Sequence, residues 1–579
     1  MATRDARGSH RTDKSIETTP NPRPWRFSSR STATATERER EVEPRPSPTP
    51  PRPPFPLPWT STAIAAHSTS SPPAPMAMDL DRDRGRDRDG YGDGAALVAS
   101  TSNGRGRGRG HLNDLPEDIL AVILRRLLDT RAAARTSFAV PPLAPRLEMG
   151  PHDSSIVRAA LAAHAVHAVT NINKLYVVCL RSATPDATAS WIRVAAPLIS
   201  GELAFCNRAS VPFHMLFDEV FSDPIEERGA LELPCFTRAT KIALRLGFLG
   251  LSLPPSGVFA ALRELRLSFV RFHGELTLDD TVMPFLEGLE IYSARVLASL
   301  TLRLKHLNWM NLSAVRGLLR LNAVVPRLKF LTVSCCFCSS TWLVAMAGVC
   351  IVAEELQVLR WLDWYCPRLI KFSQMPRLYV LSVSPFYPYG RHRQHTKFNP
   401  SCDRLLKTFS RIRCLEMLVF IEPHLGGVNP LMEGITRLPD IRFLHLQFSA
   451  HGHVYGASVL YMLTMCTGIS NLKIGGDRYK DQDVCPPNCS CDRPPNWRDN
   501  KDISMRSLRE VQMLNFRGKE HELDLLRVLV RVATGIRRIR ITCHRSFAAW
   551  ERLSAVIRSF ARPETSVEVS QAPPSLQRQ

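Results

Sequence analysis

The sequence lacks any long hydrophobic run, and no stretch approaches the roughly 18 apolar residues that a membrane-spanning helix needs. Residues 1–30 are polar and charged without an apolar centre, which indicates that no secretory signal is present. A Gly-rich phosphate loop, a nucleophile elbow and a His-Glu-x-x-His motif are all missing. We therefore expect a nuclear or cytoplasmic protein that does not contact a membrane, is not an enzyme and uses no cofactor.

Acidic residues are too few to balance the basic ones, with 54 Asp and Glu against 75 Lys and Arg and a net charge of +21. Residues 1–110 hold 18 basic and 13 acidic residues, so they carry only +5 of that total. Most of the basic excess therefore belongs to the rest of the chain, where it favours acidic partners. The 15 cysteines are scattered and odd in number, which argues against a disulfide framework and favours reduced, mostly buried thiols.

Residues 1–110 are predicted to be a disordered tail rich in proline, arginine and glycine. Pro44–Pro58 is dense in proline and Asn103–Gly110 is an Arg-Gly run, and neither can bury enough apolar surface to offset the entropy of ordering. Much of this segment is similar to translated leader sequence, so we hypothesise that synthesis starts at Met76 or Met78. A mass measurement that finds a natural N-terminus at Met1 would contradict this hypothesis.

A helix with one broad apolar face is predicted to begin near Pro116. Proline suits the first helical position, and Glu117 and Asp118 lie in the first turn, where the helix dipole favours negative charge. The apolar face consists of Ile119, Leu120, Ile123, Leu124, Leu127 and Leu128. Residues 132–138 can start a second helix. So wide an apolar face requires a partner helix, in this chain or in another.

From about Leu231 a unit of the form apolar-x-x-apolar-x-apolar recurs. Its copies are Leu262/Leu265/Leu267, Leu286/Leu289/Ile291, Leu304/Leu307/Trp309, Leu328/Leu331/Val333, Leu356/Leu359/Trp361, Leu378/Leu381/Val383, Leu415/Leu418/Phe420, Ile441/Leu444/Leu446, Leu508/Val511/Met513 and Ile536/Ile539/Ile541. A further copy is predicted around Ile469–Ile474. Most intervals fall near the 20–29 residues typical of leucine-rich repeats. The pattern predicts an α/β fold, an irregular solenoid in which each unit adds one strand to a parallel sheet and returns by helix or loop.

The last unit predicts a helix followed by a strand. Glu520–Thr534 has apolar residues at helical spacing, and Gly535 is placed to end that helix. The strand that follows alternates isoleucine with Arg538 and Arg540. These arginines lie on its solvent side, where they face an acidic target or keep an edge strand soluble.

Three segments of the chain together resemble the F-box motif of plant proteins: Leu115-Pro116-Glu117-Asp118-Ile119-Leu120, then Ile123-Leu124, then Arg135-Thr136-Ser137. Residues 508–542, which include Asn515-Phe516-Arg517-Gly518, resemble the FBD-type domain that accompanies leucine-rich repeats in the same plant family. Residues 485–499 resemble the loop that precedes this domain in grass members. The resemblance covers most of residues 111–550.

The resemblance implies a substrate-recognition subunit of an SCF-type cullin-RING ubiquitin ligase. In that family the F-box docks a Skp-type adaptor, which joins the receptor to a cullin, and the repeats bind a target protein. The adaptor-binding residues that it implies here are Leu115, Pro116, Ile119, Leu120, Ile123, Leu127, Arg135 and Ser137. The target protein itself is not identified by the sequence, and a small-molecule co-ligand stays open.

The chain departs from the family directly after the Arg-Thr-Ser segment. Pro141, Pro142 and Pro145 exclude a continuous helix where the third F-box helix is expected. The F-box is therefore incomplete, and an alternative function is a leucine-rich-repeat binding protein disconnected from any ligase. A third possibility is nucleic-acid binding through the Arg-Gly run, which we favour less because few aromatic residues accompany it.

The cysteines Cys485, Cys489 and Cys491 raise the question of a zinc site. Their C-x3-C-x-C spacing is followed by no second Cys or His pair at finger-like distance. We favour a proline-rich loop with reduced thiols over zinc binding, and predict no metal site. Residues 335–338 hold three more cysteines directly after a predicted strand, which indicates a turn that packs within a repeat.

The predicted organisation is a disordered tail over 1–110, F-box-like helices over 111–145, and a connecting region with the first irregular repeats over 146–230. Leucine-rich repeats follow over 231–475, a Cys/Pro loop over 476–502, an FBD-like terminal repeat over 503–550, and a C-terminal helix and tail over 551–579.

Overall fold

The computed structural model describes residues 146–149, 154–166, 172–179, 183–207, 229–337, 348–390, 398–423, 425, 438–466, 468–476, 489–492, 495–499 and 503–572. The predicted tail, the Arg-Gly run and the F-box-like helices lie outside these residues, so the predictions for them stay predictions.

The largest element is a sheet of sixteen strands, and all of its strand pairs are parallel. In spatial order its strands are β1 (Arg146–Met149), β2 (Ile172–Cys179), β3 (Ile199–Asn207), β5 (Lys241–Arg245), β7 (Glu264–Ser268), β9 (Gly288–Tyr292), β11 (Trp309–Ser313), β13 (Phe330–Ser334), β15 (Val358–Leu362), β17 (Val380–Phe386), β18 (Cys414–Phe420), β19 (Phe443–Ser449), β20 (Asn471–Gly475), β21 (Glu510–Phe516), β22 (Arg538–Cys543) and β23 (Ser566–Gln571). The spatial order follows the chain order throughout, as expected when each new segment adds one strand to the previous one.

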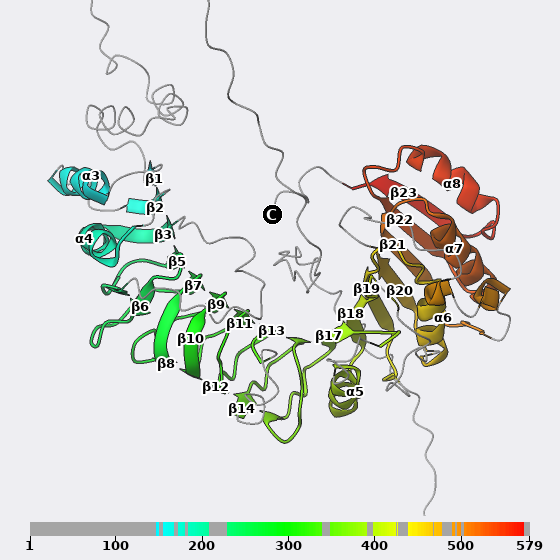
Figure 1. Cartoon of the computed structure of the whole chain (residues 1–579), viewed down its shortest axis with the longest axis horizontal. Coiled ribbons are helices and arrows are strands. Elements are labelled where there is room, and N and C mark those ends of the chain that lie inside the picture. Colours follow the sequence, from blue (N-terminus) through cyan, green and yellow to red (C-terminus); the bar gives the residue numbers. More distant parts are fainter. Residues whose placement is uncertain are drawn as a thin grey trace, which may run out of the picture. The chain divides into compact units, whose positions relative to one another are not determined.

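A second, seven-stranded parallel sheet takes up most of the connections in the middle of the chain (Figure 1). Its strands are β4 (Ala230–Glu232), β6 (Gly250–Ser252), β8 (Arg271–Asp279), β10 (Arg295–Arg303), β12 (Arg320–Val324), β14 (Gly348–Val352) and β16 (Ile370–Phe372). From β4 to β17 the chain alternates strictly between the two sheets. The prediction that helices or loops return the chain is therefore wrong for this part, where the connections contain strands of a second sheet.

Helices occupy the corresponding connections near both ends of the large sheet. They are α3 (Ser154–Val166), α4 (Pro185–Ala195), α5 (Phe398–Thr408), α6 (Gly456–Thr464), α7 (Glu520–Val532) and α8 (Trp550–Arg558), with short 3-10 helices η4 (Ser490–Asp492) and η5 (Pro495–Asp499). The described helices and the second sheet lie on the same face of the large sheet (Figure 1). The predicted α/β class with a parallel sheet is confirmed, and the other face of that sheet is covered by no described helix or strand.

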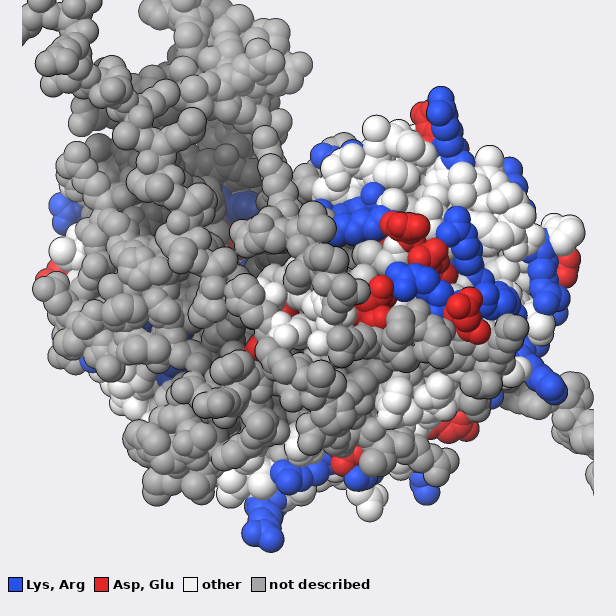
Figure 2. Space-filling model, turned by 45° about the vertical axis from the view of Figure 1, so that its right-hand side comes forward, with Lys and Arg blue, Asp and Glu red and all other residues white. Residues whose placement is uncertain are grey.

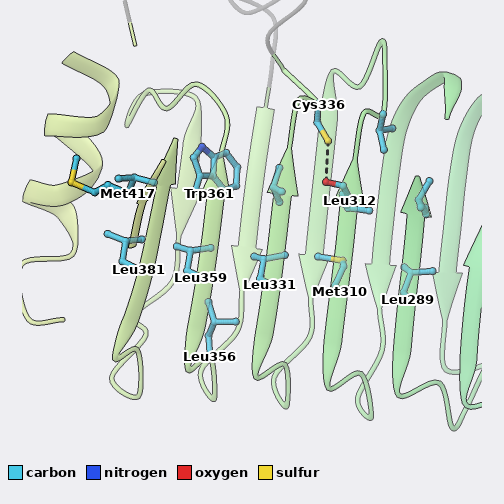
Figure 3. Close-up of a cluster of buried hydrophobic side chains, with 14 of the residues drawn as sticks. Leu289, Met310, Leu312, Leu331, Cys336, Leu356, Leu359, Trp361, Leu381 and Met417 are labelled. Carbon is cyan, nitrogen blue, oxygen red and sulfur yellow. Dashed lines mark hydrogen bonds between the residues drawn. The ribbon is translucent and has the colours of Figure 1, made fainter. Parts of the chain in front are cut away.

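The core lies between the large sheet and the layer of helices and short strands. From β9 to β17 the strands of the large sheet turn alternate residues toward this core, and these residues match in register across neighbouring strands. One such row, with at most 1% of any side chain exposed, consists of Leu289, Met310, Leu331, Leu359 and Leu381 (Figure 3). Burying a side chain of this size contributes about 1.5–3 kcal/mol. The period-2 apolar pattern of the sequence is thus satisfied by one continuous core.

Successive strands of the large sheet end in the same unusual turn. Phe269, Ser293, Ala314 and Cys335 each directly follow a strand, and each has a φ between 51° and 53°. Side chains other than glycine rarely adopt this left-handed conformation. The backbone N–H of each residue donates to a carbonyl of the next turn or strand end, at 2.8 to 3.4 Å. The sequence units therefore share a backbone conformation as well as an apolar pattern.

The predicted copy Leu304/Leu307/Trp309 is wrong by three residues. Strand β11 begins at Trp309, whose side chain is only partly buried, and the core positions are Leu307, Met310 and Leu312. Leu304 is buried too, but it follows β10 and packs as part of the preceding connection. The apolar-x-x-apolar-x-apolar unit fits the sequence with either Leu304 or Leu307 in its first position. The pattern alone therefore does not fix the register.

The copy Leu415/Leu418/Phe420 is wrong in the same way. Strand β18 buries Leu415 and Met417, with Ile412 buried just before it, whereas Leu418 and Phe420 alternate onto the opposite face and are only partly buried. The strand is long enough for its apolar residues to continue past the core positions. With these additional apolar residues, the unit also fits the sequence three residues after its true position.

Two further units of the repeat lie at β20 and β5. The copy predicted around residues 469–474 is confirmed, because β20 lies there. Another copy, Ala239/Ile242/Leu244, was not predicted and forms β5 with all three side chains buried. A small alanine at the first position conceals it from a pattern that requires large apolar side chains.

Candidate functional site

The adaptor-binding residues predicted from the sequence lie outside the described residues. They are Leu115, Pro116, Ile119, Leu120, Ile123, Leu127, Arg135 and Ser137. Their roles stay predictions. The candidate site within the described residues is the surface of the repeats that is predicted to bind a target protein.

That surface is the face of the large sheet opposite the core. On each strand one residue stands between the two core positions and points to this face, and register pairing aligns these residues across the sheet. From β7 to β23 the aligned residues, here called the polar row, are Arg266, Glu290, Asn311, Thr332, Arg360, Ser382, Glu416, His445, Lys473, Gln512, Arg540 and Glu568. All are polar or charged, in contrast to the two apolar rows on the core side.

Opposite charges alternate on this face at its N-terminal end. Glu202 lies 2.9 Å from Lys174 and 3.7 Å from Lys241, and Lys241 lies 3.4 Å from Glu264. Burial raises the pKa of the Glu202 carboxyl, but the two lysines outweigh it and lower the pKa below its usual value. From β2 to β7 the two lysines of this face therefore each lie beside a carboxylate of a neighbouring strand.

The middle of the polar row holds a partly buried charged cluster. Glu416 lies 3.5 Å from the Arg360 Nε and 3.9 Å from the His445 Nδ1, and it accepts a hydrogen bond from the Ser382 hydroxyl. Burial by itself raises the pKa of Glu416, but these three neighbours together lower it to about 2. Burial also lowers the pKa of His445, so its imidazole is neutral at pH 7. The cluster therefore carries one carboxylate and one guanidinium at neutral pH.

The C-terminal end of the row pairs arginines with carboxylates of neighbouring strands. Arg540 lies 2.8 Å from Glu510 and 3.0 Å from Glu568, and Arg538 lies 3.7 Å from Glu568. Strand β22 pairs with strands on both sides, so the idea that its arginines keep an edge soluble is wrong. On the visible described surface, basic and acidic side chains lie next to one another (Figure 2).

Aromatic side chains flank the polar row. Tyr176 of β2 and Phe443 of β19 are 38% and 45% exposed, although large apolar side chains are usually more buried. Arg266 lies over the Trp309 ring, 5.4 Å from its centre. Tyrosine, tryptophan and arginine are the residue types that most often carry binding energy in protein interfaces.

A hollow of about 530 Å³ lies at the beginnings of β18, β19 and β20. It is open to solvent and lined by Arg411, Arg413, Asp440 and Arg442 among others. Small-molecule sites are usually enclosed and mostly apolar. This polar hollow gives no support to a small-molecule co-ligand.

Two of the three cysteines of the Cys/Pro loop come together with a histidine that the sequence interpretation missed. The ligand atoms of His453, Cys489 and Cys491 all lie within 4.8 Å of one another. Finger-like spacing places a second ligand pair after the cysteines, whereas His453 precedes them in the chain. Cys485 lies outside the described residues. The group at residues 335–337 forms a turn, in which Asp363 accepts hydrogen bonds from the backbone N–H groups of Cys336 and Phe337.

Neither protein-family models nor curated proteins yield a match to this chain. Among the described helices, none is both long and apolar enough to cross a membrane.

Proposed function

We propose that this chain is the substrate-recognition subunit of an SCF-type cullin-RING ubiquitin ligase, acting in the nucleus or cytoplasm and not itself an enzyme. The F-box-like segment would dock a Skp-type adaptor and, through it, a cullin. The two-sheet body would be an irregular solenoid of leucine-rich repeats that binds a target protein. The observation that carries the proposal is the polar row together with its flanking aromatic residues.

The polarity of this face, the presence of charges of both signs and the pairing of those charges within the chain favour a protein target. Parallel sheets are usually covered on both faces, so a polar face opposite such a long core is unusual and suits a binding surface. Its charges are of both signs and are paired within the chain, as in Arg360 with Glu416 and Arg540 with Glu568. A nucleic-acid surface would instead present a stripe of basic residues.

The repeat assignment rests on the regular alternation of the fold. Each unit between β5 and β17 adds one strand to each sheet. Directly after β7, β9, β11 and β13, the chain adopts the same left-handed backbone conformation. Stacked units of this kind bury a continuous core between neighbours, which is how leucine-rich repeats are stabilised. The sequence of residues 115–137 then supplies the link to a ligase, by its resemblance to the F-box.

Binding to a Skp-type adaptor tests the proposal. The 579-residue chain should bind purified adaptor in a titration calorimeter, and Ile119→Asp/Ile123→Asp should weaken binding at least ~100-fold, because carboxylates would be buried in an apolar contact. As a control, Val258→Asp/Val556→Asp adds the same charge at sites that are 43% and 40% exposed and should bind normally. Equal binding by the Ile119→Asp/Ile123→Asp variant and the unmodified chain would refute the assigned docking residues.

One observation favours a second candidate, a repeat protein disconnected from any ligase. Directly after Pro145 the chain forms β1, the first strand of the large sheet, where the family expects its third F-box helix. The apolar docking surface is then smaller than in the family. Absence of adaptor binding by a chain that is folded by circular dichroism would establish this candidate in place of the first.

A further inference from the structure

The group formed by His453, Cys489 and Cys491 has the geometry of metal ligands. The Cys489 Sγ lies 3.5 Å from the His453 Nδ1. With Zn–S and Zn–N bonds of about 2.3 and 2.0–2.1 Å, two ligands of a tetrahedral zinc ion are separated by about 3.6 Å. His453 is 3% exposed, Cys491 is fully buried and Cys489 is partly buried, so two of the three ligands lie inside the protein.

The surroundings of His453 favour the tautomer of its ring that can bind a metal through Nδ1. Its Nε2 lies 3.2 Å from the backbone carbonyl of Pro423. Because a carbonyl only accepts, Nε2 carries the proton of the neutral ring, and the lone pair of Nδ1 points toward the sulfur. Histidines that bind metals commonly donate their other N–H to a carbonyl in this way. His453 lies in the tight turn after β19, in which His451 and Gly452 have positive φ.

The cysteines are held in place by neighbours from distant parts of the chain. The Tyr389 hydroxyl donates to the Cys491 carbonyl at 2.9 Å. The Trp497 indole donates to Asp492 at 2.7 Å. Trp497 packs on Gly456, where an added Cβ would come within 2.4 Å of the ring.

We propose that His453, Cys489 and Cys491 bind one zinc ion, which fastens the Cys/Pro loop to the turn after β19. Two thiolates and an imidazole favour zinc over magnesium or calcium, which prefer oxygen ligands. Each thiol loses its proton as the metal binds. The fourth position is left to water or to another ligand, and Cys485 is not part of the proposed site.

A metal here has a structural purpose. Residues 476–509 separate β20 from β21, and the described part of that segment contains only the short helices η4 and η5. Arg498 binds Asp492 at 2.9 Å and Asp524 of α7 at 2.8 Å, which holds the far end of the loop. Zinc would fix the near end. This inference is independent of adaptor binding and stands or fails by itself.

Metal content tests the proposal. The 579-residue chain, purified with a non-thiol reductant and dialysed against metal-free buffer, should contain about one zinc ion per chain by inductively coupled plasma mass spectrometry, and Cys489→Ser/Cys491→Ser should contain less than about a tenth of that. Cys335→Ser/Cys350→Ser removes two exposed cysteines as a matched control and should keep its zinc. His453→Asn should lower zinc affinity at least ~10-fold.

A second measurement on the unmodified chain covers the case in which these variants fail to fold. Cobalt(II) added to the metal-free protein should produce a sulfur-to-metal charge-transfer band and the visible bands of a tetrahedral site. Zinc should protect Cys489 and Cys491 from alkylation, mapped by mass spectrometry, and leave Cys335 unprotected. Absence of the cobalt bands and of zinc protection would overturn the proposal, as would full zinc content in a folded Cys489→Ser/Cys491→Ser variant.

Discussion

Replacing Asp363 by alanine is expected to lower the free energy of unfolding by about 3–5 kcal/mol, because it leaves several buried backbone donors without an acceptor. The Asp363 carboxylate is 3% exposed and accepts from the N–H groups of Cys336, Phe337 and Trp364, at 2.5, 3.0 and 2.8 Å. It thereby joins the end of β15 to the turn after β13. Urea denaturation followed by circular dichroism measures the change.

A matched control tests whether the destabilisation depends on burial, by removing an exposed carboxylate that also accepts backbone N–H groups. Asp279 accepts from the N–H groups of Thr281 and Val282, at 3.0 and 3.2 Å, in a turn that water can reach. Asp279→Ala should therefore cost less than about 1 kcal/mol. Asp363→Asn keeps one acceptor oxygen and should fall between the two. If Asp363→Ala is no more destabilising than Asp279→Ala, the turn is not fixed by the carboxylate.

Glu416→Gln is expected to remove a large part of the acid sensitivity of the fold. The pKa of Glu416 is about 2 in the folded chain and 4.5 in an ordinary setting. A lowered carboxyl pKa stabilises the folded state above the unfolded pKa, and that contribution is lost as the pH falls from about 4.5 toward 2. The shift corresponds to a contribution on the order of 3 kcal/mol at pH 7. Urea midpoints at pH 7 and pH 3 measure it for the unmodified chain and the variant.

The control for Glu416 is another glutamate of the polar row. The side chain of Glu568 is 53% exposed and pairs with Arg538 and Arg540 at the end of the sheet. Exposed ion pairs contribute about 0–1 kcal/mol, so Glu568→Gln should leave the difference between pH 7 and pH 3 nearly unchanged. An equal loss of acid sensitivity in both variants would show that burial of the central cluster is not the cause.

The parallel sheet was predictable from the sequence because each strand must bury two residues at period 2. The registers at β11 and β18 were not, since apolar residues such as Leu304 and Phe420 satisfy the same template on either side of the true core positions. The second sheet was also missed. Most of its strands are short, and β12, for example, buries only Leu321 and Ala323, which is too weak a pattern to tell from a loop.

The candidate sites depend on contacts that spacing does not encode. The polar row could be anticipated as the residues between core positions, but the pairing of Glu416 with Arg360 depends on which strands lie together. His453 stands far upstream of Cys489, and only the packing of the turn after β19 against the Cys/Pro loop brings them together. No local sequence signal marks that histidine as a ligand.

Sedimentation velocity tests the proposal that this chain links a target-binding face to a cullin. The 579-residue chain should co-sediment with a purified cullin only when a Skp-type adaptor is present, and Ile119→Asp/Ile123→Asp should abolish that complex while Val258→Asp/Val556→Asp preserves it. A folded, unmodified chain that sediments apart from the adaptor and cullin at micromolar concentration would contradict the claim.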